Sequence, residues 1–232
     1  MAKTIEDLFV YLRHAFDLLI ILLFIVNFSK FKAEKGLIAI VCYCFIDLVI
    51  TLTENYANVS DVAFVLLFAI FTFFEYLIFS YFLWLNIKNP KFRKSILYVS
   101  TAFIIFLIIY NATTKLVLNV DSVPIGIETI LILIYSFYYF FEQMKDTTNL
   151  FIYNKYSFWI ITGFMIYLSG SFFIYIFGSQ IDEVVLEQYW FLTNVFYIIG
   201  TILFAIGMII FANQQKKSKM KNHKISLSQL SF

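Results

Sequence analysis

Seven long apolar stretches occupy most of the chain and constrain its fold more than any other feature. Each is close to the ~20 mostly apolar residues that an α-helix needs to cross a bilayer. They cover residues 8–28, 36–54, 61–86, 95–112, 123–143, 157–178 and 188–212. Because 62% of the 232 residues are apolar and only 14% are charged, little polar sequence remains for a soluble domain. The sequence therefore predicts an all-α, polytopic membrane protein with a seven-helix transmembrane domain at 1–212.

Basic residues are concentrated in alternate connections between the apolar stretches, and this pattern predicts the orientation. Fourteen of them share one predicted side: Lys30, Lys32, Lys35, Lys88, Lys91, Arg93, Lys94, Lys145, Lys155, Lys216, Lys217, Lys219, Lys221 and Lys224. The opposite side holds Lys3 and Lys115 among several acidic residues. Because short basic loops stay in the cytoplasm, we expect the N-terminus outside and the C-terminus inside. The polar, basic residues 213–232 are predicted to form a disordered cytoplasmic tail.

Ionisable residues inside the apolar stretches mark the candidate site, because each costs a few kcal/mol in hydrocarbon and needs a partner. Arg13 and Asp17 are four residues apart, so they share a helical face and are predicted to pair. With a rise of ~1.5 Å per residue, one layer in the outer half of the membrane receives five polar residues. They are Arg13, Asp17, Asp47, Glu128 and Asn194. This layer predicts an outward-facing pocket for a small ligand or a cation. The competing interpretation is that the Arg13 and Asp17 pair only stabilises the outer end of the first helix.

A second set of polar residues continues toward the inner side. Glu75 is expected near the midplane of the third helix, and Tyr135, Tyr139 and Glu142 follow Glu128 along one face of the fifth. These residues are predicted to relay a rearrangement inward. The same pattern is equally consistent with hydrogen bonds that only hold helices together. Since Arg13 cannot neutralise all the buried acids, at least one is expected to be protonated, hydrated or bound to a cation.

Four glycines in the last two apolar stretches occur as pairs seven residues apart. They are Gly163 with Gly170 and Gly200 with Gly207. Small residues let membrane helices approach closely, so these positions predict tight packing of the last two helices.

Several chemistries of seven-helix proteins require residues that this sequence lacks. A retinal Schiff base needs a lysine in the last helix, and 188–212 contains none. Zinc hydrolases and haem bundles need several histidines, whereas only His14 lies near an apolar stretch. No phosphate-binding loop or nucleophile motif is present. We therefore expect no enzyme activity, no metal, no cofactor and no nucleic-acid partner.

The segments "YSFWIITGFMIYLSGSFFIYIFGSQ" and "YWFLTNVFYIIGTILFAIGMII" cover most of the last third of the chain. They resemble the last two helices of small, uncharacterised seven-helix proteins of Bacteroidetes-type bacteria, which are similar to the membrane sensor regions of some histidine kinases. The resemblance implies a sensor in a bacterial inner membrane. The roughly twenty residues after Phe211 leave no room for a kinase domain, so output is expected to pass to a separate protein. No catalytic residue carries over.

These observations favour a receptor-like or sensory membrane protein with an outer polar pocket, surrounded by the lipid bilayer and signalling to a separate partner. Two other classes stay open. A proton, cation or small-molecule transporter could use the same acids as a path from Asp47 and Glu128 through Glu75 to Glu142. A membrane subunit of a larger assembly, including a homo-oligomer, would expose an apolar helix face instead.

Overall fold

The computed structural model describes residues 2–56, 60–113, 122–145, 151–177 and 183–229, and within them it contains helices and no strands. The helices are α1 (Ala2–Val26), α2 (Phe28–Phe31), α3 (Lys35–Tyr56), α4 (Asp61–Asn86), α5 (Pro90–Thr113), α6 (Ser122–Lys145), the 3₁₀ helix η1 (Ile152–Asn154), α7 (Tyr156–Phe177) and α8 (Glu183–Gln229). Seven of them, all except α2 and η1, are long and apolar enough to cross a membrane. The predicted all-α, multi-pass architecture is confirmed, and each predicted stretch coincides with one of these helices.

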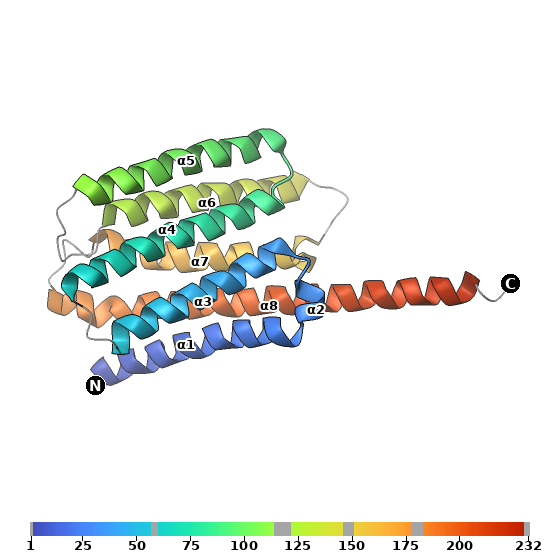
Figure 1. The fold of residues 1–232 in the computed structure, drawn as a ribbon, viewed down its shortest axis with the longest axis horizontal. Coiled ribbons are helices and arrows are strands. Elements are labelled where there is room, and N and C mark those ends of the chain that lie inside the picture. The colour runs from blue at the N-terminus through green and yellow to red at the C-terminus, as the bar shows by residue number, and fades with distance from the viewer. Residues whose placement is uncertain (1, 57–59, 114–121, 146–150, 178–182, 230–232) are drawn as a thin grey trace.

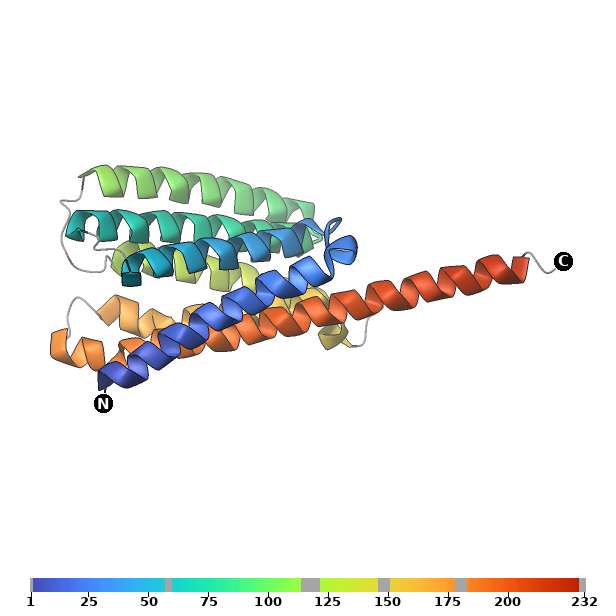
Figure 2. The ribbon, with the colours of Figure 1, turned by 60° about the horizontal axis from the view of Figure 1, so that its bottom comes forward.

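Successive long helices run in opposite directions, so the two termini lie at opposite ends of the bundle (Figure 1). We call these the N-terminal end and the basic end. Six helices form a closed ring in the order α1, α3, α4, α6, α7, α8, with α8 packed again on α1. Helix α5 packs mainly on α4 at the outside of this ring, as Figures 1 and 2 both show. The ring therefore encloses side chains from six helices, while α5 is peripheral.

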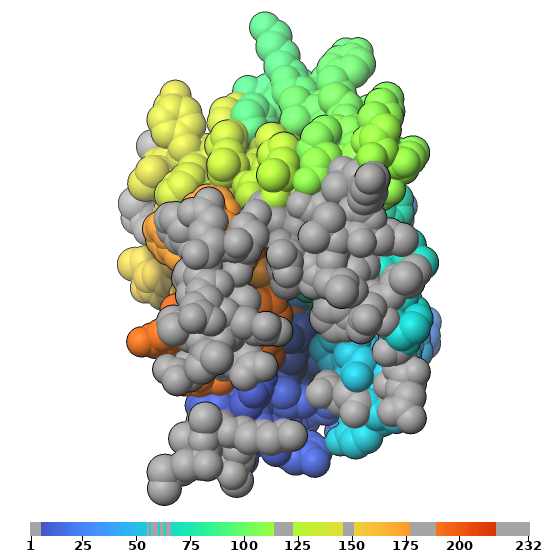
Figure 3. Space-filling model, turned by 90° about the vertical axis from the view of Figure 1, so that its left-hand side faces the viewer, coloured from blue at the N-terminus to red at the C-terminus, as the bar shows by residue number. Residues whose placement is uncertain are grey.

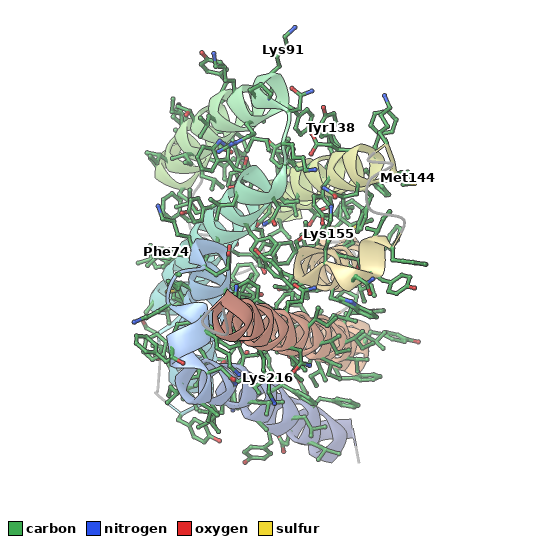
Figure 4. The ribbon with its side chains drawn as sticks, turned by 90° about the vertical axis from the view of Figure 1, so that its right-hand side faces the viewer. Phe74, Lys91, Tyr138, Met144, Lys155 and Lys216 are labelled. Atoms are coloured by element: carbon green, nitrogen blue, oxygen red, sulfur yellow. The ribbon has the colours of Figure 1, made fainter. Side chains whose placement is uncertain are left out.

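The basic end carries the described basic side chains of the helix connections. Figure 4 looks onto this end, with Lys91 on α5, Lys155 before α7 and Lys216 on α8. Lys115, which the sequence pattern assigns to the opposite end, lies outside the described residues. The bundle is therefore asymmetric in charge along its long axis.

Aromatic rings fill the middle of the ring of helices. Phe79 of α4 stacks on Phe164 of α7 with ring centroids 3.9 Å apart. Tyr43 of α3 lies 4.8 Å from Phe79, and Phe204 of α8 lies 5.4 Å from Phe164. All four side chains are almost completely buried. Large rings from four helices therefore fill the centre of the bundle.

The glycines of the last two helices predicted close approach to neighbouring helices, and the structure shows that α7 and α8 approach each other in this way. A Cβ atom on Gly163 would lie 2.8 Å from the carbonyl oxygen of Gly200, and one on Gly200 would lie 3.1 Å from that of Gly163. A Cβ on Gly207 would lie 2.9 Å from the carbonyl oxygen of Tyr156. Backbone therefore packs directly on backbone along this interface, which only glycine permits.

Residues 213–229 are helical, whereas the sequence predicts a disordered tail there. Helix α8 continues without a break to Gln229 and projects past the basic end of the bundle (Figure 2). Residues 208–229 contain no proline, so nothing in the chain stops propagation from the membrane helix. Adding residues to an existing helix avoids the cost of nucleation, which is why a polar segment can follow an apolar one in the same helix.

Candidate functional site

Arg13 connects three helices at the N-terminal end of the bundle. Its Nε donates to Oδ2 of Asp47 on α3 at 2.9 Å, and its Nη2 donates to Oδ1 of the same carboxylate. Its Nη1 donates to Oδ1 of Asn194 on α8 at 3.0 Å. The Asp47 side chain is completely buried, whereas that of Arg13 keeps 14% of its surface exposed. The planar guanidinium thus makes a bidentate ion pair with Asp47. This geometry best compensates the desolvation cost of a buried carboxylate.

The predicted pairing of Arg13 with Asp17 is wrong. The ion pair of Arg13 in the described structure is with Asp47, and Oδ1 of Asp17 instead accepts a hydrogen bond from the Tyr197 hydroxyl at 2.6 Å. The Arg13 guanidinium lies 4.2 Å above the Tyr197 ring, so Tyr197 links the two residues. The guanidinium can form a bidentate pair with a carboxylate on a facing helix. This geometry is favoured over a contact with Asp17 on its own helix.

A cavity of about 270 Å³ opens above this cluster toward the N-terminal end. Its lining residues come from α1, α3, α4, α7 and α8: Glu6, Val10, Arg13, Asp47, Ile50, Thr51, Glu54, Phe68, Phe71, Tyr175, Trp190, Thr193 and Asn194. Figure 3 faces this end, where α1 in blue and the end of α3 in cyan lie side by side. Arg13 is two helical turns further into the bundle than Glu6, so it belongs to the floor and Glu6 to the rim.

Aromatic rings form one wall of the cavity. The Tyr175 ring of α7 lies perpendicular to that of Trp190 on α8, with centroids 5.8 Å apart. On its other side, Tyr175 lies 6.2 Å from Phe68 of α4. Three rings from three helices thus stand in succession beside the polar floor.

Glu128 does not belong to this cavity. Helix α6 packs on α4 and α7, across the ring from α1, so the Glu128 side chain meets a different part of the interior. It is 1% exposed, and neither carboxylate oxygen has a hydrogen-bond partner among the described residues. A second buried acid, Glu75, lies on the neighbouring helix α4. Of the five predicted pocket residues, Arg13, Asp47 and Asn194 line the cavity.

Glu75 is connected to the cavity floor through two tyrosines. Its Oε1 accepts a hydrogen bond from the Tyr43 hydroxyl at 2.9 Å. The ring of Tyr43 lies 6.2 Å from that of Tyr197, which contacts Arg13 and Asp17. This chain of contacts runs from the floor to the middle of the bundle, so it joins the predicted relay residue Glu75 to the predicted pocket.

The other predicted relay residues do not continue this chain. The Tyr135 hydroxyl lies 3.4 Å from that of Tyr76, and the Tyr139 hydroxyl shares a hydrogen bond of 2.8 Å with Ser157. Glu142 accepts hydrogen bonds from the backbone N–H groups of Lys88 and Asn89, both at 2.7 Å. Each residue is therefore tied to a separate neighbour, and Glu142 holds the connection between α4 and α5 at the basic end.

The sequence predicts that Tyr197 shares a polar helical face with Asn194, because it follows Asn194 by three residues. Three other residues that surround the cluster were not predicted. Tyr43, Tyr175 and Trp190 have no comparable signal, since tyrosine and tryptophan are common near the ends of membrane helices. Their role depends on which helices become neighbours.

Comparison with known proteins assigns no family to the chain. No protein-family model, curated protein or solved structure matches it. Within the described residues, no group of three or more His, Cys, Asp and Glu side chains is placed to hold a metal ion. Functional conclusions therefore depend on the geometry of the cavity and of the buried acids.

Proposed function

We propose that this protein is a receptor-like or sensory membrane protein whose cavity binds a small ligand at the outer side of a bacterial inner membrane. The observation that carries the proposal is the cavity of about 270 Å³, open at one end of the bundle and floored by Arg13, Asp47 and Asn194. Concave sites in which a few polar groups converge beside aromatic and apolar side chains are the usual form of ligand sites. The charge asymmetry of the bundle favours the N-terminal end as the outer side.

The contacts below the cavity support a route for a signal. A ligand that displaces the Arg13 guanidinium would disturb the Tyr197 ring beneath it, and with it the hydrogen bond to Asp17. Tyr43 contacts Tyr197 and bonds to Glu75, so the disturbance would reach α3 and α4. Such a shift of two helices would change the basic end, where we propose that a separate cytoplasmic or membrane protein binds. The resemblance of the last two helices to kinase sensor regions agrees with this assignment.

The proposal is tested by ligand-dependent thermal stabilisation of the protein in lipid nanodiscs, using a library of small metabolites. The variant Val10→Trp places a large ring into the cavity lining and should abolish stabilisation by any hit. Leu12→Trp is the matched control, because this residue lies on the same helix, is exposed and does not line the cavity. Hits that stabilise the Val10→Trp variant as strongly as the wild type would contradict binding in the cavity.

Transport is the second candidate function, and the burial of the Glu128 carboxyl group favours it. Among the described residues, the buried Glu128 carboxyl group has no hydrogen-bond donor, and the neighbouring helix α4 carries a second buried acid, Glu75. Buried acids in membrane helices often mark proton paths. Flux measured in proteoliposomes separates the two candidates. A saturable, acid-dependent flux that is lost in Glu75→Gln would assign a transporter, whereas ligand binding without flux would assign a receptor.

A further inference from the structure

We propose that a pocket at the basic end of the bundle binds the headgroup phosphate of an anionic phospholipid. The pocket has a volume of about 210 Å³ and lies between α1, α2 and α8. It is at the opposite end of the bundle from the ligand cavity, where α2 crosses beside α8 (Figure 1). The depth of this pocket, its polar groups and the apolar surface that leads into it all favour the same ligand.

The pocket lies at the boundary between the apolar span of α1 and the polar connection that follows it. The span of α1 ends at Val26, and the lining residues Leu23 and Asn27 come just before and just after this point. On α8, Ile209 lines the pocket, and Asn213 follows one turn nearer the basic end. Apolar lining thus gives way to polar lining along the axis of the bundle. In a bilayer, the glycerol and phosphate groups of lipids occupy this depth, between the hydrocarbon core and water.

A lysine and two amides supply hydrogen-bond donors for a phosphate. Lys30 is partly buried in the pocket, and its Nζ donates to Oδ1 of Asn27 at 2.9 Å. Because an ammonium group has three N–H donors, Lys30 can keep this bond and also donate to a phosphate oxygen. The side-chain amides of Asn27 and Asn213 line the same pocket and add neutral donors. The positive charge of Lys30 favours a lipid with a net negative headgroup over a zwitterionic one.

Exposed apolar side chains continue from the pocket along the membrane spans. Ile209 is 48% exposed, and Ile202, two turns deeper on the same face of α8, is 38% exposed. On α1, Leu19 precedes the lining residue Leu23 by four residues, shares its helical face and is 40% exposed. Because α1 packs on α8, an acyl chain that extends from the pocket would lie against apolar side chains of both helices. The site therefore fits a phospholipid better than a free phosphate ion.

The volume of the pocket agrees with a headgroup and not with a whole lipid. At about 30 Å³ per water molecule, a pocket of about 210 Å³ holds roughly seven waters. This space admits a phosphate group and part of its glycerol. The acyl chains must therefore stay outside the pocket, against the exposed apolar side chains of α1 and α8.

Native mass spectrometry of the full-length protein in detergent tests the proposal, with phosphatidylglycerol and phosphatidylcholine of identical acyl chains as the two ligands. One lysine near a membrane surface favours an anionic lipid about fivefold, so we expect phosphatidylglycerol to bind more tightly by about this factor. Equal binding of the two lipids would overturn the proposal.

The source of the phosphate is tested with sn-glycerol 3-phosphate, which carries the phosphate without acyl chains. Since burial of acyl CH₂ groups contributes to lipid binding, this compound should bind more than about tenfold more weakly than phosphatidylglycerol. Binding as tight as that of the lipid would identify a site for a soluble phosphate compound and would overturn the assignment to a phospholipid.

Variants of Lys30 locate the charge that selects the lipid. Lys30→Gln removes this charge with little change of length and should abolish the preference for phosphatidylglycerol, whereas Lys30→Arg should retain it. Lys32→Gln is the matched control, because Lys32 is exposed at the same end and is not one of the described residues that line the pocket. A preference that survives in Lys30→Gln, or that is lost equally in Lys32→Gln, would assign the effect to the general charge of the basic end and overturn this site.

A second variant blocks the pocket without changing its charge. Ile209→Trp places a larger side chain in the lining and should weaken phosphatidylglycerol binding at least about fivefold. Leu97→Trp on α5 is the control, because Leu97 is exposed and, like Ile209, lies seven residues from the end of its span at the basic end. Equal effects of the two tryptophan variants would contradict binding between α1 and α8.

Discussion

The ion pair between Arg13 and Asp47 offers the sharpest test of the structure, through the variants Arg13→Gln and Asp47→Asn and their combination. Removing Arg13 leaves a completely buried carboxylate without its cation. Loss of one partner of a buried ion pair costs about 3–5 kcal/mol. Two hydrogen bonds to a charged group, at about 1.5–3 kcal/mol each, lead to a similar figure. Neutral interhelical hydrogen bonds in membranes contribute only about 0.6 kcal/mol on average, so the charge dominates the effect.

The two single variants should differ because the two side chains differ in exposure. The Arg13 side chain is 14% exposed and lines the cavity, so in Asp47→Asn water can hydrate its guanidinium. We expect a loss of about 1–3 kcal/mol there, compared with about 3–5 kcal/mol for Arg13→Gln. The double variant pairs two neutral amides, so it should be more stable than Arg13→Gln alone. The coupling energy should reach about 2 kcal/mol or more.

The assay is reversible unfolding in mixed micelles with an increasing fraction of denaturing detergent, followed by tryptophan fluorescence. Thr53→Val serves as the control, because among the described residues the Thr53 hydroxyl bonds only to the backbone of its own helix at Val49. Its loss should change stability by less than about 0.5 kcal/mol. Single-variant effects that add within about 0.5 kcal/mol in the double variant would refute the pairing. A larger cost for Asp47→Asn than for Arg13→Gln would refute the argument from exposure.

Three further predictions use the same unfolding assay. Gly163→Ala should cost about 1–3 kcal/mol, because its Cβ would lie 2.8 Å from a backbone oxygen. Gly126→Ala is the control and should be neutral or stabilising, because the nearest atom to its Cβ would be 3.5 Å away. Equal effects of the two variants would contradict the tight packing of α7 and α8. Glu128→Met should leave stability unchanged or higher, because no described group bonds to its carboxylate. Glu75→Met should cost about 1–3 kcal/mol, because it leaves the Tyr43 hydroxyl without its acceptor. A larger cost for Glu128→Met than for Glu75→Met would contradict the hydrogen bonding described for these two acids. Glu142→Ala should cost about 1 kcal/mol without changing ligand binding, and a lost ligand response would restore Glu142 to the relay.

The sequence by itself determined the seven membrane helices, their alternating direction and the gathering of basic residues at one end. These properties are local, since hydropathy over ~20 residues decides whether a segment forms a membrane helix, and charge near its ends decides its direction. The sequence also singled out Arg13, Asp47 and Asn194, which line the cavity, because polar groups are costly in hydrocarbon wherever they face. The seven-residue spacings of Gly163 with Gly170 and of Gly200 with Gly207 predicted that the last two helices approach their neighbours closely.

Only the tertiary structure decided which of these residues meet. Arg13 bonds to Asp47 on a neighbouring helix and not to Asp17 one turn away, and Glu128 lies across the ring of helices from both. Distance along a helix axis indicates the depth of a residue in the membrane. It does not indicate the rotation of the helix or the identity of its neighbours, which depend on side-chain packing among all seven helices at once. For that reason the cavity and its aromatic wall, built from five different helices, appear only when the helices are assembled.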